Sequence, residues 1–469
     1  MIARLLLTGV VSLAALVAEP LRLHPENPHY FLFRGKPAVL ITSGEHYGAV
    51  LNLDFNYTRY LETLNRDRLN LTRTFTGVYS EVPGSFQIAS NTLAPKPSRF
   101  ISPWQRAGDK FDLTKWDQAY FARLKDFLRK ANDHDVVVEL VLFCPYYKDE
   151  MWEVSPLNAR NNINDLGNVG REEVLTLRHP GLVKVQEAMV KKIVTELNGF
   201  DNLYYEICNE PYFGGVTLEW QAHIAGVIAE TEKTLPKRHL IAQNIANGSR
   251  KIENPNPLVS IFNFHYSRPP ESVAMNYSLN KAIGNNETGF DGVEDDTYRI
   301  QGWEFLLAGG ALYNNLDYSF AAGSEDGTFQ YPSAQPGGGS TRLRRYLRNL
   351  HDFMDRIDFI HMKPDRSILA GGLPENASFQ ALVEPGKSYA VYIHHGRVVK
   401  DAKPRYQVDA TPHQLALELE LPAGTYHMMW VNPKSAKVEK SSTLRHPGGK
   451  TTLDSPEYSE DIALRLTAN

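Results

Sequence analysis

The sequence predicts an α/β fold, a (β/α)8 TIM barrel followed by a C-terminal antiparallel β-sandwich domain. Eight apolar, β-rich runs alternate with amphipathic stretches up to about residue 320, and short alternating runs separated by turn residues follow them. Strands that alternate with helices form a parallel sheet, and eight such units close it into a barrel. The length of 469 residues also exceeds one ordinary domain.

The predicted barrel strands are short apolar runs followed by polar or turn-forming residues. Val136–Phe143 is nearly continuous in apolar residues, which is typical of a parallel strand covered on both faces. Amphipathic stretches between the runs, among them Asp117–Asn132, Pro180–Asn198 and Leu218–Leu235, predict helices. The eight predicted strands are Ala38–Ser43, Leu69–Phe75, Val136–Phe143, Leu203–Cys208, His239–Gln243, Ser260–His265, Lys281–Asn285 and Ala311–Asp317.

The pattern changes after a last predicted helix at Thr341–Ile357. Ser388–His394, Gln414–Leu421 and Thr425–Val431 alternate with period two and are separated by Pro-Gly, Ala-Gly and Asn-Pro turns, which predicts an antiparallel sandwich. We therefore divide the chain into a signal peptide (1–18), a (β/α)8 catalytic barrel (19–360) and a β-sandwich domain (361–469).

The N-terminus carries one arginine, an apolar run from Leu5 to Ala18, and then Glu19-Pro20. This pattern is typical of a secretory signal peptide and predicts a secreted or periplasmic protein; the alternative is a buried strand or helix. No other stretch approaches the roughly 20 apolar residues that a membrane span needs, so we expect no stable membrane insertion after signal removal.

Charge and cysteine content exclude other classes of function. The formal net charge is -4 with no long basic run, which gives no reason to expect a nucleic-acid partner. Cys144 and Cys208 are the two cysteines, so we expect buried thiols and no disulfide framework. With so few thiols and no paired-histidine helix, we expect no metal site, and no organic cofactor is implied.

Two segments place a glutamate at the end of a predicted strand. Residues 204–211 read Tyr-Tyr-Glu-Ile-Cys-Asn-Glu-Pro, and residues 282–289 read Ala-Ile-Gly-Asn-Asn-Glu-Thr-Gly. Because active sites of such barrels lie at the carboxyl ends of the strands, Glu210 and Glu287 should meet. Glycoside hydrolysis by double displacement needs one protonated and one ionised carboxyl group. Glu210 is the predicted acid/base and Glu287 the predicted nucleophile.

Other interpretations of these glutamates exist. Glu210 could be a surface residue at a helix N-terminus. Glu294, in an acidic run that continues to Asp296, competes with Glu287, although such a run is more often a solvated face. Glu206 lies inside its strand, and we assign it to a buried ionic network, which must be paired.

Several residues near the strand ends could support the two carboxylates. Asn209 can hydrogen-bond a sugar 2-hydroxyl, or it can hold the turn. Arg73 could keep Glu287 ionised. His265 and Tyr266 could orient the nucleophile and line the cleft, although a lone histidine is often a satisfied core residue. Further predicted substrate-binding residues are Trp104, Trp152, Trp303 and Tyr212, each of which could equally be packing, and the rim residues His46, Tyr47 and Asp317.

Two long insertions follow predicted strands, at 76–112 and 145–179. Both are rich in Pro, Asn, Gly and aromatic residues. Insertions of this length suit the wall of a binding cleft better than a plain connection.

The motifs Asn209-Glu210-Pro211 and Asn286-Glu287-Thr288-Gly289, with His265-Tyr266 between them, resemble the retaining (β/α)8 glycoside hydrolases of clan A. The resemblance is to cellulase-like, family 5-like bacterial secreted proteins and covers roughly residues 25–355. It implies that Glu210 is the acid/base and Glu287 the nucleophile. It also implies that Asn209, Arg73 and the pair His265-Tyr266 contact them.

The chain departs from that resemblance at the eighth strand, where the best-known clan members commonly carry a tryptophan. Here the strand ends Asn314-Asn315-Leu316-Asp317-Tyr318, without a tryptophan, which leaves open whether the substrate is cellulose or any common β-glucan at all. The segment 426–433, Tyr-His-Met-Met-Trp-Val-Asn-Pro, resembles a β-sandwich module that bears the name collagen-binding in related bacterial proteins. We expect a module packed against the barrel.

The sequence thus predicts a secreted retaining glycoside hydrolase that acts on an oligo- or polysaccharide. Two alternatives are a non-catalytic carbohydrate-binding protein on the same barrel and an adhesion protein that works through the sandwich.

Overall fold

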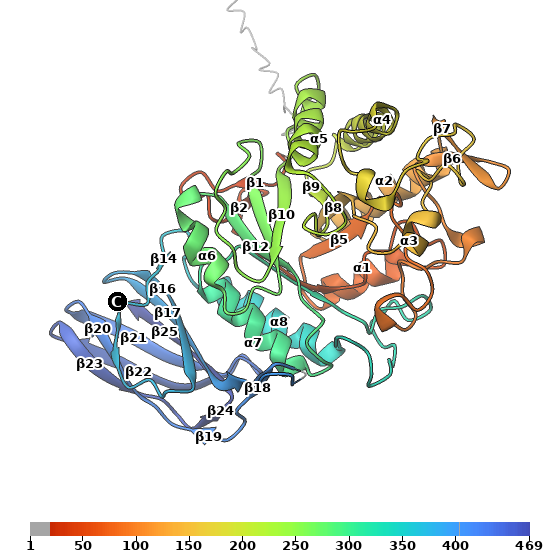
Figure 1. The fold of residues 1–469 in the computed structure, drawn as a ribbon. Coiled ribbons are helices and arrows are strands. Elements are labelled where there is room, and N and C mark those ends of the chain that lie inside the picture. Colours follow the sequence, from red (N-terminus) through yellow and green to blue (C-terminus); the bar gives the residue numbers. More distant parts are fainter. Residues whose placement is uncertain (1–18, 403) are drawn as a thin grey trace, which may run out of the picture.

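The computed structural model describes residues 19–402 and 404–469 (Figure 1). The signal peptide predicted for residues 1–18 therefore lies outside the described residues. Over the described ranges, no helix has both the length and the apolar character needed to cross a membrane.

The predicted barrel is confirmed. Eight strands pair in parallel in the order β4-β13-β12-β11-β10-β9-β8-β5. All eight predicted strands are present, with ends that shift by a few residues. They are β4 (Leu40–Gly44), β5 (Leu71–Phe75), β8 (Val137–Phe143), β9 (Leu203–Cys208), β10 (Ile241–Asn247), β11 (Ile261–His265), β12 (Ala282–Glu287) and β13 (Leu312–Leu316).

Between β4 and β5 the barrel is closed by the side chain of Asn70. Its Oδ1 accepts from the Ile41 amide at 2.8 Å, and its Nδ2 donates to the Val39 carbonyl at 2.8 Å. The Asn70 amide also donates to the Ile41 carbonyl at 3.2 Å. Together with the bond from the Phe75 amide to the Tyr47 carbonyl (3.0 Å), these contacts stand in for a regular ladder and satisfy backbone groups that would otherwise lack partners.

Helices between the strands begin at capping residues that the sequence supplies. The Asp117 carboxylate accepts from the amides of Ala119 (2.8 Å) and Tyr120 (3.0 Å) at the start of α2, and Thr217 and Ser340 cap α5 and α8. The helices are α1 (Tyr57–Arg66), α2 (Gln118–Asp133), α3 (Asp149–Glu153), α4 (Pro180–Leu197), α5 (Leu218–Glu232), α6 (Glu271–Asn276), α7 (Asp295–Leu307) and α8 (Thr341–Met354).

The C-terminal strands form antiparallel sheets that fit the predicted sandwich. The larger sheet has the order β14-β16-β17-β25-β21-β22, and the smaller has β15-β20-β23. Their strands are β14 (Lys363–Pro364), β15 (Leu369–Gly371), β16 (Ala377–Glu384), β17 (Ser388–Val398), β20 (Ala416–Leu421), β21 (Gly424–Val431), β22 (Val438–His446), β23 (Gly449–Asp454) and β25 (Asp461–Ala468). Apolar side chains of both sheets, such as Phe379, Leu417 and Trp430, make one core.

Short strands complete the chain. The insertion after β5 forms a hairpin of β6 (Trp104–Ala107) and β7 (Lys110–Trp116), and α3 lies in the insertion after β8. The others are β1 (Arg22–Leu23), β2 (Phe31–Phe33), β3 (Lys36–Ala38), β18 (Tyr406–Val408), β19 (Pro412–His413) and β24 (Tyr458–Ser459).

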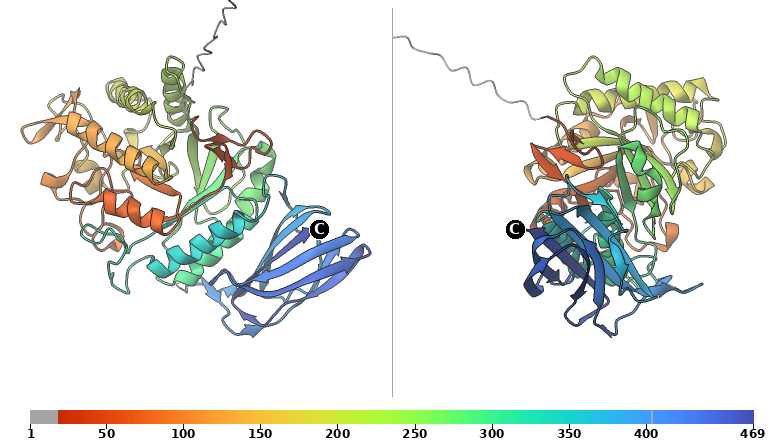
Figure 2. Two further views of the ribbon diagram at one scale, coloured as in Figure 1. Left: turned by 180° about the vertical axis from the view of Figure 1, so that it is seen from behind. Right: turned by 90° about the vertical axis from the view of Figure 1, so that its left-hand side faces the viewer.

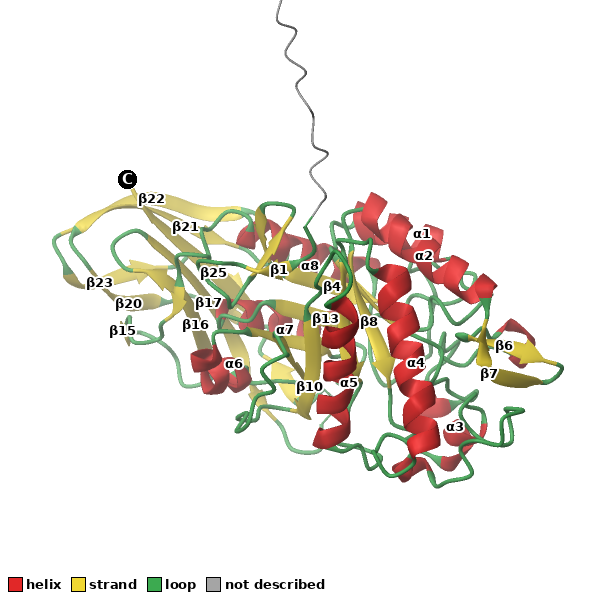
Figure 3. Cartoon of the chain, turned by 90° about the horizontal axis from the view of Figure 1, so that it is seen from above, coloured by secondary structure: helices red, strands yellow, loops and turns green. Residues whose placement is uncertain are grey.

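The sandwich packs against α7 and α8 of the barrel (Figures 2 and 3). Helix α7 is buried along nearly its whole length because β13 lies on one side and β16 and β17 lie on the other. In this junction Arg299 donates to Asp461 through Nε (2.9 Å) and to Glu460 through Nη2 (2.6 Å). Tyr392 also donates to Asp461 at 2.8 Å, so a fully buried ion pair joins the two parts.

Removing one partner of the ion pair between Arg299 and Asp461 should destabilise the fold. We expect Asp461→Ala to lower the free energy of unfolding by about 3–5 kcal/mol, because Arg299 would remain buried with its main partner gone. Urea unfolding followed by tryptophan fluorescence measures the loss. Asp454→Ala, at an exposed position of β23, is the matched control. Equal losses in the two variants would contradict the role of the junction.

Candidate active site

A cleft of about 440 Å³ opens at the carboxyl ends of the barrel strands. Glu210 and Glu287 lie in its wall together with Asn209 and Tyr266. Both long insertions contribute, as expected: Tyr79, Glu81, Phe86 and Leu93 come from the first, and Tyr147 from the second.

Glu210 follows β9 in a left-handed conformation (φ 36°) and is 8% exposed. Its Oε2 accepts from the hydroxyl of Tyr147 at 2.5 Å. Its Oε1 contacts the hydroxyl of Tyr212 and Nδ1 of His265, both at 3.2 Å. A non-glycine residue with positive φ is uncommon, and here the turn aims the carboxylate into the cleft rather than along the strand.

Glu287 is the last residue of β12 and is 6% exposed. Arg73 donates through Nη1 to its Oε2 at 3.1 Å, and the Tyr266 hydroxyl donates to its Oε1 at 2.5 Å. A cation and a hydroxyl donor on its two oxygens suit a carboxylate anion.

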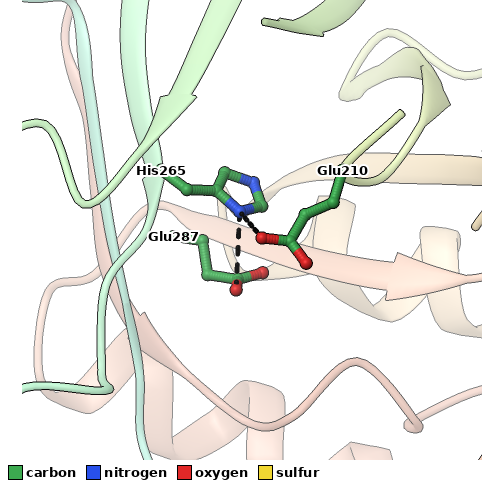
Figure 4. Close-up of side chains that lie close together, drawn as sticks. All are labelled: Glu210, His265 and Glu287. Atoms are coloured by element: carbon green, nitrogen blue, oxygen red, sulfur yellow. Dashed lines mark hydrogen bonds and ion pairs between the residues drawn. The ribbon is translucent and has the colours of Figure 1, made fainter. Parts of the chain in front are cut away.

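His265 lies between the two glutamates, as Figure 4 shows. Its Nδ1 is 3.2 Å from Oε1 of Glu210 and 3.5 Å from Oε1 of Glu287. One carboxylate oxygen of each glutamate and a ring nitrogen of His265 all lie within 4.8 Å of one another. These three side chains also offer the ligand types that metals bind, but the fixed charge of Arg73 beside Glu287 opposes a second cation there.

Arg73, on β5, reaches three groups at the bottom of the cleft. Besides Glu287, its Nη2 donates to Glu206 and to Oδ1 of Asn209 (2.8 Å), and its guanidinium lies 4.6 Å over the ring of Tyr47. Burial lowers the pKa of Arg73, but the charge of Glu206 and neighbouring groups outweighs burial, so the pKa is raised well above its ordinary value. Arg73 is therefore a permanent charge.

Beneath Arg73, Glu139 and Glu206 form a buried acidic pair. The side-chain amides of Asn263 and Asn286 each donate to both carboxyl groups at 2.7–2.9 Å. Burial raises the pKa of Glu139 well above its usual range. Burial also acts to raise the pKa of Glu206, but the charge of Arg73 and the hydrogen bonds of neighbouring groups together outweigh it, so that pKa is lowered. Glu139 is thus neutral while Glu206 pairs with Arg73, in agreement with the ionic network predicted for Glu206.

Most of the predicted support residues gather at the site. Asn209 accepts from Arg73 and donates through Nδ2 to the Tyr147 hydroxyl at 2.9 Å. Tyr266 and Tyr212 touch the two glutamates. His46 and Tyr47 line the cleft, and their rings are stacked.

The structure places four other predicted residues away from the cleft wall. Trp104 stacks on Trp116, Trp152 donates through Nε1 to the Val169 carbonyl at 2.9 Å, and Trp303 packs against Phe353 and Tyr392. Asp317 accepts from Arg344 at 2.7 Å and from Ser43 at 2.9 Å. None of these four belongs to the lining among the described residues, because each is held by packing or pairing elsewhere.

Sequence reasoning missed several lining residues. Tyr147 lies four residues beyond the end of β8 and Phe213 five residues beyond the end of β9, where the strand-end rule could have found them. Asn247 was missed because β10 continues four residues past the predicted Gln243, through an irregularity after Asn244. Phe86, Glu81 and Phe290 reach the cleft through loop conformations that no strand pattern encodes.

The pKa of Glu210 is lowered, whereas a residue that donates a proton needs a raised pKa. Burial raises the Glu210 pKa, but the hydrogen bond and charge of His265, together with the hydrogen bonds of Tyr147 and Tyr212, outweigh burial, so the pKa is lowered. From the sequence we assign His265 to the nucleophile, Glu287. Instead His265 contacts both carboxylates and is closer to Glu210.

Replacing His265 should therefore raise the pKa of Glu210. His265→Asn removes the largest effect that lowers it, so the carboxylate form should persist to a lower pH in wild type than in the variant. Carboxyl carbon NMR, with Glu210 assigned from Glu210→Gln, follows the titration. Tyr212→Phe removes one neutral donor and should move the pKa less. An unchanged or lower pKa in His265→Asn would contradict this electrostatic account.

No family model matches the chain, and no curated protein matches it in sequence. Solved structures share the fold at low identity. One is a Bacteroides vulgatus protein provisionally assigned as a glycoside hydrolase; it is 13% identical, the match covers 96% of this chain and 83% of that one, and the TM-score is 0.65. Another glycoside hydrolase is 14% identical, with coverage of 96% of this chain and 97% of that one and a TM-score of 0.63. A third is a family 5 glycoside hydrolase from Bacteroides vulgatus. It is 14% identical, the match covers 96% of this chain and 93% of that one, and the TM-score is 0.62. These similarities establish the architecture of barrel plus sandwich.

Proposed function

We propose that the protein is a retaining glycoside hydrolase that cleaves a poly- or oligosaccharide by double displacement. The observation that carries the proposal is the approach of Glu210 and Glu287 to within 4.8 Å, from the ends of two different strands. Retaining enzymes hold their carboxyl groups about 5–5.5 Å apart, whereas inverting enzymes need about 6.5–9.5 Å to admit a water. The short approach supports retention.

In the first proposed step, Glu287 attacks the anomeric carbon and Glu210 gives a proton to the departing glycosidic oxygen. In the second, Glu210 takes a proton from water, whose oxygen attacks the anomeric carbon and releases Glu287. Arg73 and Tyr266 hold Glu287 and stabilise it as the leaving carboxylate. Asn209, fixed by Arg73 and Tyr147, is placed to hydrogen-bond the sugar beside the reacting carbon.

The lowered pKa of Glu210 means that this carboxyl group must gain a proton before it can act as an acid. Sugar binding excludes water from the cleft, and this further desolvation raises the pKa of Glu210 and favours its protonated form.

The rest of the cleft suits a sugar. Phe86, Phe213 and Phe290 offer ring faces, and Glu81 and Asn247 offer hydrogen-bonding groups. Apolar faces with a few polar groups are the composition of carbohydrate sites. The structural neighbours named as glycoside hydrolases add an analogy of fold. We further propose that the protein binds its substrate outside the cytoplasm, as the signal-peptide pattern at the N-terminus predicts.

The second candidate is a carbohydrate-binding protein without turnover. The observation that favours it is the lowered pKa of Glu210, which leaves the acid/base ionised in the free protein at neutral pH. Turnover of any glycoside that depends on both glutamates would exclude this candidate.

Replacement of each glutamate by alanine tests the proposal. Glu287→Ala should abolish turnover of every substrate, because no covalent intermediate forms. Glu210→Ala should retain the first step for aryl glycosides with good leaving groups, which need little protonation. A panel of polysaccharides and aryl glycosides assayed for released reducing ends and phenol reports both effects. Azide should restore product from both variants, with opposite anomeric configurations.

Glu294→Ala is the matched control, because Glu294 is exposed and precedes α7. It should retain full activity. Full activity in Glu210→Ala or Glu287→Ala would refute the assignment of the pair.

Tyr147 provides a graded test of the same site. Tyr147→Phe removes the hydroxyl that donates to Glu210 and accepts from Asn209. Hydrogen bonds to charged groups contribute about 1.5–3 kcal/mol, so kcat/KM should fall roughly tenfold to hundredfold while folding is retained. Steady-state kinetics with circular dichroism as the folding control measures this, and an unchanged kcat/KM would remove Tyr147 from the site.

A further inference from the structure

A second cavity, of about 700 Å³, lies where the barrel loops meet the sandwich. The barrel contributes Arg268 and Glu304, and the sandwich contributes His394, Arg397 and Tyr406. Strand β18, which carries Tyr406, lies beside α7, as Figure 1 shows. Tyr266 and Phe290 line this cavity and the catalytic cleft, so the two are adjacent.

Arg268 is the unusual group in this cavity. Its side chain is 13% exposed, and its guanidinium lies 3.7 Å over the ring centre of Tyr406. Both terminal nitrogens, Nη1 and Nη2, are buried and have no hydrogen-bond partner among the described residues. Its Nε is 3.9 Å from Glu304, so the carboxylate lies at the limit of an ion pair. Buried donors of a charged group without acceptors are costly unless a ligand satisfies them.

The charges around the cavity favour an anion. Arg268, Arg397 and Arg405 line it, against the two carboxylates of Asp291 and Glu304. Both acids have partners: Asp291 accepts from the Arg405 amide at 2.8 Å. Glu304 lies 3.3 Å from His394.

We propose that this cavity binds a carboxylate-bearing sugar, namely a uronate unit of the substrate. The proposal rests on the proposed function, because this unit belongs to the same oligosaccharide whose cleaved bond lies between Glu210 and Glu287. Planar guanidinium groups match a carboxylate in a bidentate pair; the exposed Arg397 offers such a group, and Arg268 adds its positive charge. Tyr406 and Phe290 supply aromatic surface beside it, and Phe290 is 36% exposed. The sandwich then forms part of the substrate-binding surface.

The test measures binding without turnover, in the Glu287→Ala background. Titration calorimetry compares oligosaccharides that contain glucuronic or galacturonic acid with the same oligosaccharides after chemical reduction of each carboxylate to a hydroxymethyl group. We expect at least one acidic oligosaccharide to bind about tenfold more tightly than its reduced form at low salt, and the difference should shrink at high salt. A sulfated galactan oligosaccharide distinguishes carboxylate from sulfate recognition.

Three variants assign the preference to the cavity. Arg268→Met should abolish the difference between acidic and reduced oligosaccharides, and Arg397→Met, at an exposed position of β17, should reduce it even if Arg268→Met fails to fold. Arg250→Met, an exposed arginine outside both cavities, should retain it. Three results would overturn the proposal. The Glu287→Ala protein could bind the acidic and reduced oligosaccharides equally well, or it could bind the sulfated oligosaccharide more tightly than the acidic one. The preference for the acidic oligosaccharide could also persist in both Arg268→Met and Arg397→Met.

Failure of this proposal and failure of the proposed function remain distinguishable. The affinities are measured on a chain that cannot turn over, so they do not depend on the roles of the glutamates. Turnover in the parent chain depends on Glu210 and Glu287 whether or not an acidic sugar is preferred.

Discussion

The guanidinium of Arg73 is the positive charge on which the arrangement of the candidate active site depends. It joins Glu206 of β9, Glu287 of β12 and Asn209 in one buried group. Charges removed from water are tolerated only when they are paired and hydrogen-bonded. Arg73 supplies that pairing where three strands end, so the shape of the site and its electrostatics come from the same contact.

Charge balance then decides the state of each carboxyl group. With one fixed cation, the interior cannot hold every carboxyl group ionised, and the acidic pair under Arg73 resolves this by keeping Glu139 neutral. At the top of the barrel, His265 lies between Glu210 and Glu287 and couples them. The proposed acid/base and nucleophile therefore share one contact partner rather than standing as two independent groups.

The features that the sequence predicted well are those that follow from strand periodicity. The eight barrel strands could be recognised as apolar runs, and the rule that functional groups follow strand ends brought Arg73, Asn209, Glu210, His265, Tyr266 and Glu287 together. The pattern of short alternating runs likewise predicted the sandwich.

Features that depend on tertiary packing could not be predicted in this way. A tryptophan looks the same in the sequence whether it stacks on a sugar or fills a core, and Trp104 and Trp303 are fully buried. The direction of the Glu210 pKa depends on a histidine ring that stands 55 residues away along the chain. The cavity around Arg268 exists only because the sandwich packs on α7.

The stereochemistry of hydrolysis tests the central claim most directly. Once a hydrolysed glycoside of known anomeric configuration is found, proton NMR of the first sugar released, recorded before mutarotation, reports whether that configuration is kept. Double displacement by Glu287 and Glu210 predicts that the product has the same configuration as the substrate. A product of inverted configuration would contradict the account, because it would require a water between the two carboxylates in place of a covalent bond to Glu287.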